Sequence, residues 1–153
     1  MTSIKRGDPL WATLEQVPSE TQEQRTIIDW WRTVGAAKYD LPPELLFAIP
    51  NGGQRNKIVA AKLKAEGVVA GVPDLCLAVG WGGRHCLWIE LKRRKGGRVS
   101  QAQQHMHSMM RLYSGAVHVC RGADEAISCI CTYLDKLFDT GLKPLSYWRT
   151  QDE

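Results

Sequence analysis

The chain has 153 residues, 44% of them apolar and 24% charged, and a formal net charge of +4. This length and composition are typical of one globular domain with a substantial core, and they exclude a disordered chain. No apolar run approaches the roughly eighteen residues of a membrane span, and no signal segment opens the sequence, so we expect a cytoplasmic protein.

The first half of the chain predicts two helices around a short strand. Residues 20–37 form the first helix, with an apolar stripe at helical spacing: Ile27, Trp30, Trp31 and Val34. Two prolines end this segment. Residues 45–50 then suit a short strand, and residues 54–66 suit a second helix that Gly67 ends.

Residues 73–79 and 86–92 predict a β-hairpin. Both segments are apolar, and the intervening residues 80–85 contain three glycines that can turn the chain back. Counting inward from this turn places Val79 opposite about Cys86. By the same count, Asp74 falls opposite about Leu91.

After the hairpin, the sequence predicts a helix, a strand and a last helix. Ser100 is a suitable N-cap for a helix that runs to about Tyr113 and is stopped by Gly115. Residues 116–120 suit a short strand, and residues 123–138 suit a helix. Helices and strands therefore alternate, which predicts an α/β fold.

The strand at residues 86–92 gives the first sign of a chemical site. Its alternation puts Glu90 and Lys92 on one face and three apolar residues on the other: Leu87, Ile89 and Leu91. A carboxylate beside an ammonium in an apolar strand is costly unless the charges are paired or bound to a metal.

The hairpin would bring a second carboxylate, that of Asp74, close to Glu90. Two carboxylates can hold one hard cation, as Mg²⁺ and Mn²⁺ prefer, and Lys92 could then orient a water or offset charge on a phosphorus. Taken singly, a Pro-Asp pair usually marks a turn and a Glu-x-Lys pair is usually solvated. Their conjunction across a glycine-rich turn is rarer, and it favours metal-dependent hydrolysis of a phosphodiester.

Three motifs resemble the virus-type replication-repair nuclease (VRR-NUC) domain, a branch of the PD-(D/E)XK nucleases. They are Gly71-Val72-Pro73-Asp74, Ile89-Glu90-Leu91-Lys92 and Gly97-Arg98-Val99-Ser100-Gln101-Ala102-Gln103. The resemblance covers about residues 19–134. It implies a restriction-endonuclease-like α/β core, with a mixed central β-sheet flanked by α-helices, and Mg²⁺- or Mn²⁺-dependent cleavage of DNA.

Stand-alone members of this family, often phage-encoded, resemble homodimers that act on branched or junction DNA in replication, recombination or repair. The resemblance therefore implies a homodimer in the cytoplasm of a bacterial host. It also divides the chain into an N-terminal extension (1–18), a nuclease domain (19–137) and a C-terminal tail (138–153).

The resemblance further implies roles for single residues. Asp74 and Glu90 would be metal ligands, with the Leu91 carbonyl as a further ligand. Lys92 would be the catalytic lysine, and Gln103 would match the glutamine of the family's Ser-x-x-Gln helix start.

Glu20 would match an acidic metal ligand on the first helix. Glu23 lies within the same turns and is the weaker candidate. Ser19 is a plausible N-cap with Gln22 as its capping partner, and in that case both glutamates only complement the helix dipole.

A basic run indicates a polyanionic partner. From Arg84 to Arg98 there are six Lys or Arg residues and one acidic residue, Glu90. A charge run is usually a solvated surface, but this one follows the strand of the predicted site. We therefore predict DNA contacts that add affinity without reading sequence: Arg55, Lys57, Arg93, Arg94, Lys95 and Arg98. No helix-turn-helix, finger or nucleotide-binding loop is present, so we expect structure-selective binding and no nucleotide cofactor.

The cysteines and histidines do not predict a second chemistry. Five cysteines without a C-x-x-C pair indicate neither a zinc site nor a disulfide framework. His105 and His107 are two residues apart on a predicted helix and so do not share a face. We expect all four histidines to be structural or surface residues.

Two other classes of function stay open from the sequence. One is a non-catalytic nucleic-acid-binding module on the same fold, and the other is a structural or interaction protein with an incidental basic patch. For the homodimer, Trp30, Trp31 and Trp148 are candidate interface residues, although burial in the core is the commoner fate of tryptophan.

Overall fold

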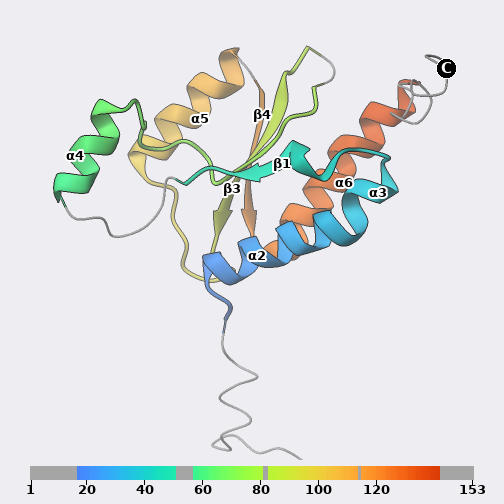
Figure 1. Cartoon of the computed structure of the whole chain (residues 1–153), viewed down its shortest axis with the longest axis horizontal. Helices are drawn as coiled ribbons and strands as arrows, with labels where there is room; N and C mark the ends of the chain where they lie inside the picture. The colour runs from blue at the N-terminus through green and yellow to red at the C-terminus, as the bar shows by residue number, and fades with distance from the viewer. Residues whose placement is uncertain (1–16, 51–56, 81–82, 114, 142–153) are drawn as a thin grey trace, which may run out of the picture.

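The computed structural model describes residues 17–50, 57–80, 83–113 and 115–141 (Figure 1). Its sheet has four strands in the order β1-β2-β3-β4. They are β1 (Leu46–Ala48), β2 (Leu75–Leu77), β3 (Cys86–Lys92) and β4 (Gly115–Arg121). The pairs β1–β2 and β2–β3 are antiparallel, and β4 pairs in parallel with β3. This mixed sheet between helices is the predicted α/β class.

The helices cover both faces of the sheet. The predicted first helix is one helical segment with a wider turn inside it: α2 (Glu20–Trp30), the π-helical turn η1 (Trp31–Gly35) and α3 (Ala36–Lys38). After the 3₁₀ turn η2 (Pro43–Leu45) follow α4 (Lys57–Ala65), α5 (Gln101–Tyr113) and α6 (Ala123–Asp139). Figure 1 shows α5 on one side of the sheet and α2, α3 and α6 on the other.

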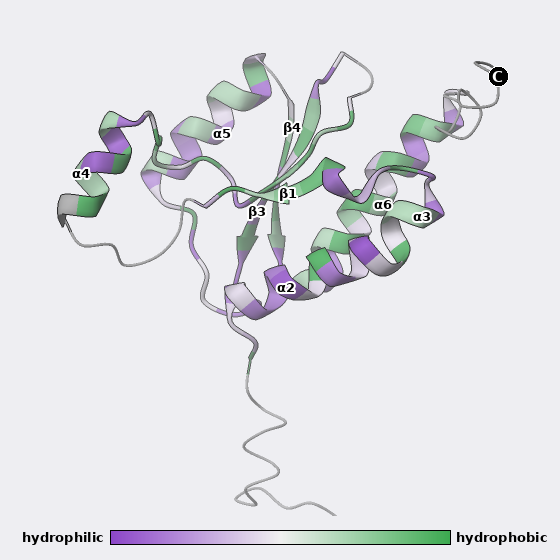
Figure 2. Ribbon diagram, viewed as in Figure 1, coloured by the Kyte–Doolittle hydropathy of each residue, from purple (hydrophilic) through white to green (hydrophobic). Residues whose placement is uncertain are grey.

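The core lies between the sheet and the pair of helices α2 and α6. Leu87, Ile89 and Leu91 of β3 are at most 2% exposed and pack with Ile27 of α2 and Ile130 of α6. Each such side chain contributes about 1.5–3 kcal/mol relative to an exposed one. In Figure 2, β1 is hydrophobic while α2 alternates between hydrophilic and hydrophobic residues, as expected of a helix with one packed face.

The pairing of β2 with β3 differs from the predicted register by one residue. Leu75 pairs with Ile89, so continuing the ladder sets Asp74 opposite Glu90 and not Leu91. The prediction treated residues 80–85 as an unpaired turn. The backbones of the two hairpin segments instead stay close as far as Gly80, where an added Cβ would lie 2.6 Å from the Arg84 carbonyl oxygen. The loop is therefore shorter than the prediction assumed.

An ion-pair network joins α2, the end of β3 and α6. Arg94 Nε donates to Glu23 Oε1 (2.6 Å), and Arg94 Nη1 donates to Asp124 Oδ2 (2.8 Å). Glu23 Oε2 accepts the Ala123 N–H (2.8 Å) at the start of α6. Arg94 can reach these partners because residue 122 is a glycine, at φ +84°. An added Cβ at this position would lie 2.7 Å from Arg94 Nε.

The tryptophans of the first helical segment belong to the core. Trp31 has no exposed surface, and its Nε1 donates to the Pro43 carbonyl oxygen (2.9 Å). A residue without exposed surface cannot contact a second subunit, so the predicted interface role of Trp31 is wrong. Trp30 is half-buried against the same core, and Trp148 lies outside the described residues.

Membrane crossing was not expected from the sequence. Within the described ranges, no helix has both the length and the hydropathy that a bilayer span requires.

Replacing Glu23 by alanine should destabilise the fold. The change leaves the Ala123 N–H and Arg94 without their carboxylate, which we expect to lower the free energy of unfolding by about 1–3 kcal/mol. Hydrogen bonding to Arg94 lowers the pKa of Glu23. The stabilisation is therefore complete above the ordinary glutamate pKa of about 4.3 and is lost as the pH falls through the lower, folded-state value.

Urea denaturation of wild type and Glu23→Ala at neutral and acidic pH measures this difference. Glu66→Ala is the control, since Glu66 forms only an exposed ion pair with Lys62 (3.8 Å) and should change stability by less than about 1 kcal/mol. Equal effects of the two substitutions would contradict the role of the network.

Candidate active site

The hairpin brings two carboxylates together at one end of the sheet. Asp74 directly precedes β2, and its Oδ2 accepts the N–H of Leu91 in β3 (2.8 Å). The register sets Asp74 across from Glu90, and residues directly opposite each other in an antiparallel pair point to the same face. The predicted ligands Asp74 and Glu90 therefore lie side by side, with Leu91 bonded to the first through its backbone.

Glu90 is a buried carboxylate that is held by two donors. It has no exposed surface, and Lys92 is 7% exposed. Glu90 Oε1 accepts hydrogen bonds from Lys92 Nζ (2.5 Å) and from Gln103 Nε2. The structure thus brings three of the predicted catalytic residues into direct contact, on the sheet face that α5 covers.

Gln103 is fixed by the N-terminus of α5. Its Oε1 accepts the Ser100 N–H (2.8 Å), while Ser100 Oγ accepts the Gln103 N–H (3.2 Å). This reciprocal capping box uses the amide oxygen of Gln103. The amide NH₂ group is then the part that is left to face Glu90. The hydrogen-bond network therefore determines the orientation of this amide.

Gly71 packs the segment before Asp74 against the start of α5. It has φ +88°, and an added Cβ would lie 2.4 Å from the Ala102 carbonyl oxygen and 2.9 Å from the Gln103 nitrogen. No side chain fits there, and L-residues rarely adopt this φ. The backbone that leads to Asp74 therefore packs directly on the backbone that carries Gln103.

Glu20 faces the site from the first turn of α2. Its Oε1 accepts the Arg93 N–H (3.2 Å), and its charge helps to raise the pKa of both Asp74 and Glu90. Glu23, the weaker candidate, is instead bound to Arg94 and Ala123. Of the two glutamates, only Glu20 is brought to the carboxylate pair.

The site holds more negative charge than its own cations compensate. Burial, followed by the charge of Glu90, raises the pKa of Asp74 to about 6. Burial also raises the pKa of Glu90, although Lys92 opposes the shift. Carboxylates in this condition bind either a proton or a cation.

His107 is a site residue that the sequence did not predict. It is 2% exposed, and its Nε2 lies 3.4 Å from Glu90 Oε2. Burial lowers the pKa of His107, which favours the neutral imidazole. Its spacing of two residues from His105 does not indicate this position. The informative spacing is the four residues from Gln103, which puts both side chains on one face of α5.

The donor set of the site fits a hard cation. Within the described part of the chain, Glu90 Oε2 and His107 Nε2 are buried without a hydrogen bond, so one oxygen of the Glu90 carboxyl group has no donor. The described residues contain no group of three or more His, Cys, Asp or Glu side chains able to hold a metal. Mg²⁺ does not need one, because it keeps several waters and uses one or two carboxylates together with substrate phosphates. Asp74 and Glu90 meet that requirement.

The basic residues near the site differ in their surroundings. Three predicted DNA contacts are exposed around the turn that follows β3: Arg93, Lys95 and Arg98. Arg94 is also exposed, but its guanidinium pairs with Glu23 and Asp124, and its contact with DNA stays a prediction. Lys57 begins α4, and Arg55 lies outside the described residues.

Comparisons with known proteins identify the family of this chain. A family model for the VRR-NUC domain matches residues 13–124, a range that contains every motif of the site. A solved structure described as a VRR_NUC domain protein has 26% sequence identity and a TM-score of 0.67, over 78% of this chain and 91% of that chain. No curated protein matches the sequence. The family match over most of the chain shows that this protein belongs to the VRR-NUC domain family and has a nuclease-type fold.

Proposed function

We propose that the protein is a divalent-metal-dependent DNA endonuclease, and that its substrate is branched or junction DNA. The observation that carries the proposal is the contact of Glu90 with Lys92 and Gln103, with Asp74 across the hairpin. Membership of a nuclease family supports the same reaction class. We further propose that residues 19–137 form the nuclease domain.

In the proposed mechanism, Asp74 and Glu90 hold Mg²⁺ or Mn²⁺, with the Leu91 carbonyl and Glu20 as further ligands. A cation bound there would supply Lewis-acid chemistry, acting on the scissile phosphate and on the attacking water. Lys92, held at Glu90, orients that water or offsets the charge that develops on the phosphorus. Gln103 keeps the Glu90 carboxylate in one orientation, because its own amide is fixed by Ser100.

The exposed basic residues after β3 are the proposed contacts to the DNA backbone. Arg93, Lys95 and Arg98 follow the strand that carries Glu90, so a phosphate held by them would lie near the site. Such contacts predict binding that weakens steeply with salt.

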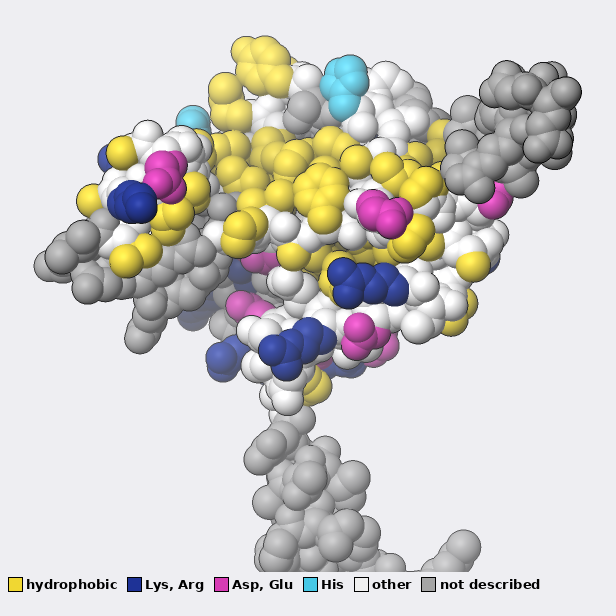
Figure 3. Space-filling view, viewed as in Figure 1, with side chains coloured by type: hydrophobic (Ala, Val, Ile, Leu, Met, Phe, Trp, Pro, Cys, Tyr) yellow, Lys and Arg dark blue, Asp and Glu magenta, His cyan; other side chains and the backbone are white. Residues whose placement is uncertain are grey.

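A homodimer would supply two sites for the paired strands of a junction. In Figure 3, hydrophobic side chains gather over the region of the edge strand β1. Phe47 of this strand is 42% exposed. This surface supports the proposed association in place of Trp31.

Cleavage of a panel of labelled branched and linear DNAs with Mg²⁺ and Mn²⁺ tests the proposal. We expect wild type to cut branched DNA, and Asp74→Asn, Glu90→Gln and Lys92→Ala each to lower the rate by about 100-fold or more. Circular dichroism of the variants checks that they fold. Full activity of any one variant would remove that residue from the mechanism.

The same panel separates the other classes of function. Stable DNA binding without nicking by wild type under either ion would favour a non-catalytic binding module. Absence of DNA binding even at low salt would favour an interaction protein whose basic patch is incidental.

Asp74→Asn should stabilise the metal-free protein at neutral pH. Because the folded-state pKa of Asp74 is raised to about 6, ionisation of this group costs stability as the pH rises from about 4 to 6. Asparagine removes that cost and can still accept the Leu91 N–H. Thermal unfolding in EDTA should therefore show a stability gain that is absent near pH 4 and grows to a plateau above pH 6. The exposed Asp29→Asn is the control, and a gain without this pH dependence would contradict the crowding of carboxylates.

Replacing Gln103 by methionine should reduce the rate of cleavage, whereas the same substitution at the neighbouring Gln104 should leave the rate unchanged. Gln103→Met removes the donor to Glu90 and one half of the capping box, and supporting residues of this kind typically contribute about 10–100-fold. Gln104→Met is the matched control, since Gln104 is exposed and donates only to the Val99 carbonyl oxygen (3.3 Å). Cleavage rates at several Mg²⁺ concentrations measure the effect. Equal losses in both variants would mean that the helix start matters and the Glu90 contact does not.

A further inference from the structure

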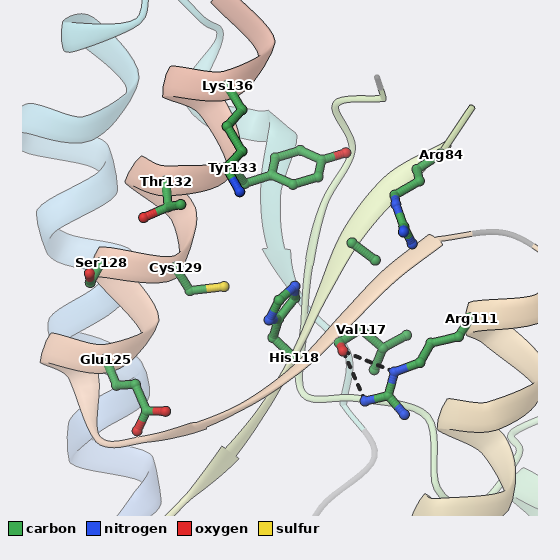
Figure 4. Close-up of a pocket in the computed structure, with 11 residues that line it drawn as sticks. Arg84, Arg111, Val117, His118, Glu125, Ser128, Cys129, Thr132, Tyr133 and Lys136 are labelled. Carbon is green, nitrogen blue, oxygen red and sulfur yellow. Dashed lines mark hydrogen bonds between the residues drawn. The ribbon is translucent and has the colours of Figure 1, made fainter. Parts of the chain in front are cut away.

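A second cluster of reactive side chains lines a cavity beside the edge strand β4. The cavity has a volume of about 760 Å³ and lies between β4, α6 and the end of α5 (Figure 4). Its lining includes Cys129 and His118 but none of Asp74, Glu90 and Lys92. Its size is within the range of small-molecule sites. The cavity is therefore a separate candidate site.

The surroundings of Cys129 favour the thiolate form of its side chain. Figure 4 shows its sulfur directed from α6 toward the His118 ring on β4. Hydrogen bonds from Cys120 and from His118 lower the pKa of Cys129 to about 5, although burial and Glu125 oppose them. Cys120 is only 2% exposed, so the negative charge is better tolerated on the half-buried Cys129.

The charged residues in the lining of the cavity are mostly basic. Arg84, Arg111 and Lys136 line it together with a single acidic residue, Glu125. Arg111 is held in place because its Nε and Nη2 donate to the Val117 carbonyl oxygen (3.2 and 2.9 Å). Glu125 Oε2 accepts the Arg121 N–H (2.7 Å). This arrangement favours a negatively charged reaction partner.

We propose that Cys129 is a modification site that exchanges with low-molecular-weight disulfides carrying carboxylates. The Cys129 sulfur attacks one sulfur of the disulfide, and a new S–S bond forms as the old one breaks. The other half leaves as a thiolate and takes up a proton from water. The disulfide is the only oxidant required. This inference is independent of the proposed nuclease activity.

The test compares an anionic with a cationic disulfide on the full-length protein. Reduced protein is incubated with oxidised glutathione or with cystamine, and peptide mass spectrometry locates and quantifies the mixed disulfides. We expect Cys129 to be modified first, and oxidised glutathione to react about tenfold faster than cystamine at low salt. The difference should shrink as the ionic strength rises.

The pH dependence gives a second readout. Between about pH 6 and 8 the rate at Cys129 should change little, because the thiolate is already formed. In urea, where the chain is unfolded, the rates should rise by roughly tenfold per pH unit.

Matched variants separate the site from the other cysteines and charges. Cys129→Ser should abolish the fast modification, and Cys131→Ser, two residues along the same helix, should leave it unchanged. Arg84→Gln and Lys136→Gln should reduce the preference for oxidised glutathione, whereas Lys62→Gln on α4 should not.

Three results would overturn the proposal. They are first modification at another cysteine, equal rates with the two disulfides, and a rate at Cys129 that rises with pH as it does in the unfolded chain. Peptide mapping of wild type yields all three readouts even if Cys129→Ser does not fold.

Discussion

The polar contacts between the sheet and α5 depend on how the fold tolerates the charge of Glu90. This carboxylate has no exposed surface and lies in a strand that is otherwise almost wholly buried. Taking such a group out of water costs several kcal/mol, roughly, unless partners compensate. Lys92 and Gln103 both donate to the same oxygen, Oε1, whereas Oε2 accepts no hydrogen bond among the described residues and has only His107 Nε2 close by, at 3.4 Å. The compensation is therefore one-sided, and Oε2 is the oxygen left for the cation of the proposed mechanism.

Two contacts between distant parts of the chain put this carboxylate in register with its neighbours. Gly71 lies against the backbone at Ala102, so the start of β2 and the start of α5 cannot shift independently. Arg94 reaches Glu23, which is 71 residues away, and fixes the end of β3 between α2 and α6. Because these contacts hold the end of β3, and α5 packs on its polar face, Glu90 and Lys92 are fixed relative to Gln103.

The sequence predicted what depends on local pattern. Alternation in residues 86–92 was enough to place Glu90 and Lys92 on one face, and the order of helices and strands was enough for the fold class. The register of the hairpin was missed by one residue, because the length of a glycine-rich turn does not say how far pairing continues into it. The ion pairs of Arg94 could not be predicted for another reason. A continuous basic run does not reveal which member pairs with a glutamate far away in the sequence.

The strands β3 and β4 carry two opposite electrostatic environments. Parallel pairing sets Leu91 beside Cys120, and Leu91 is also the residue whose N–H binds Asp74. On the α5 side, buried carboxylates are short of positive charge. On the α6 side, Cys129 and His118 line a cavity whose charged residues are mostly basic. The thickness of one sheet separates the site proposed to hold a cation from the cavity proposed to receive an anion.

Because Arg94 crosses Gly122 to reach Glu23, the segment from Lys92 to Arg94 can hardly change in length during evolution. An inserted or deleted residue between Lys92 and Arg94 would rotate one of the two side chains away from its partner, either Glu90 or Glu23. Such length changes should therefore be purged. The turn after Arg94 is limited only in part. Lys95 and Gly96 are exposed, and an added Cβ at Gly96 would meet nothing within 4 Å, but at Gly97 it would lie 2.9 Å from Lys92 Cβ. An insertion before Gly97 that keeps this contact would extend the basic surface while the acidic pair stays in place.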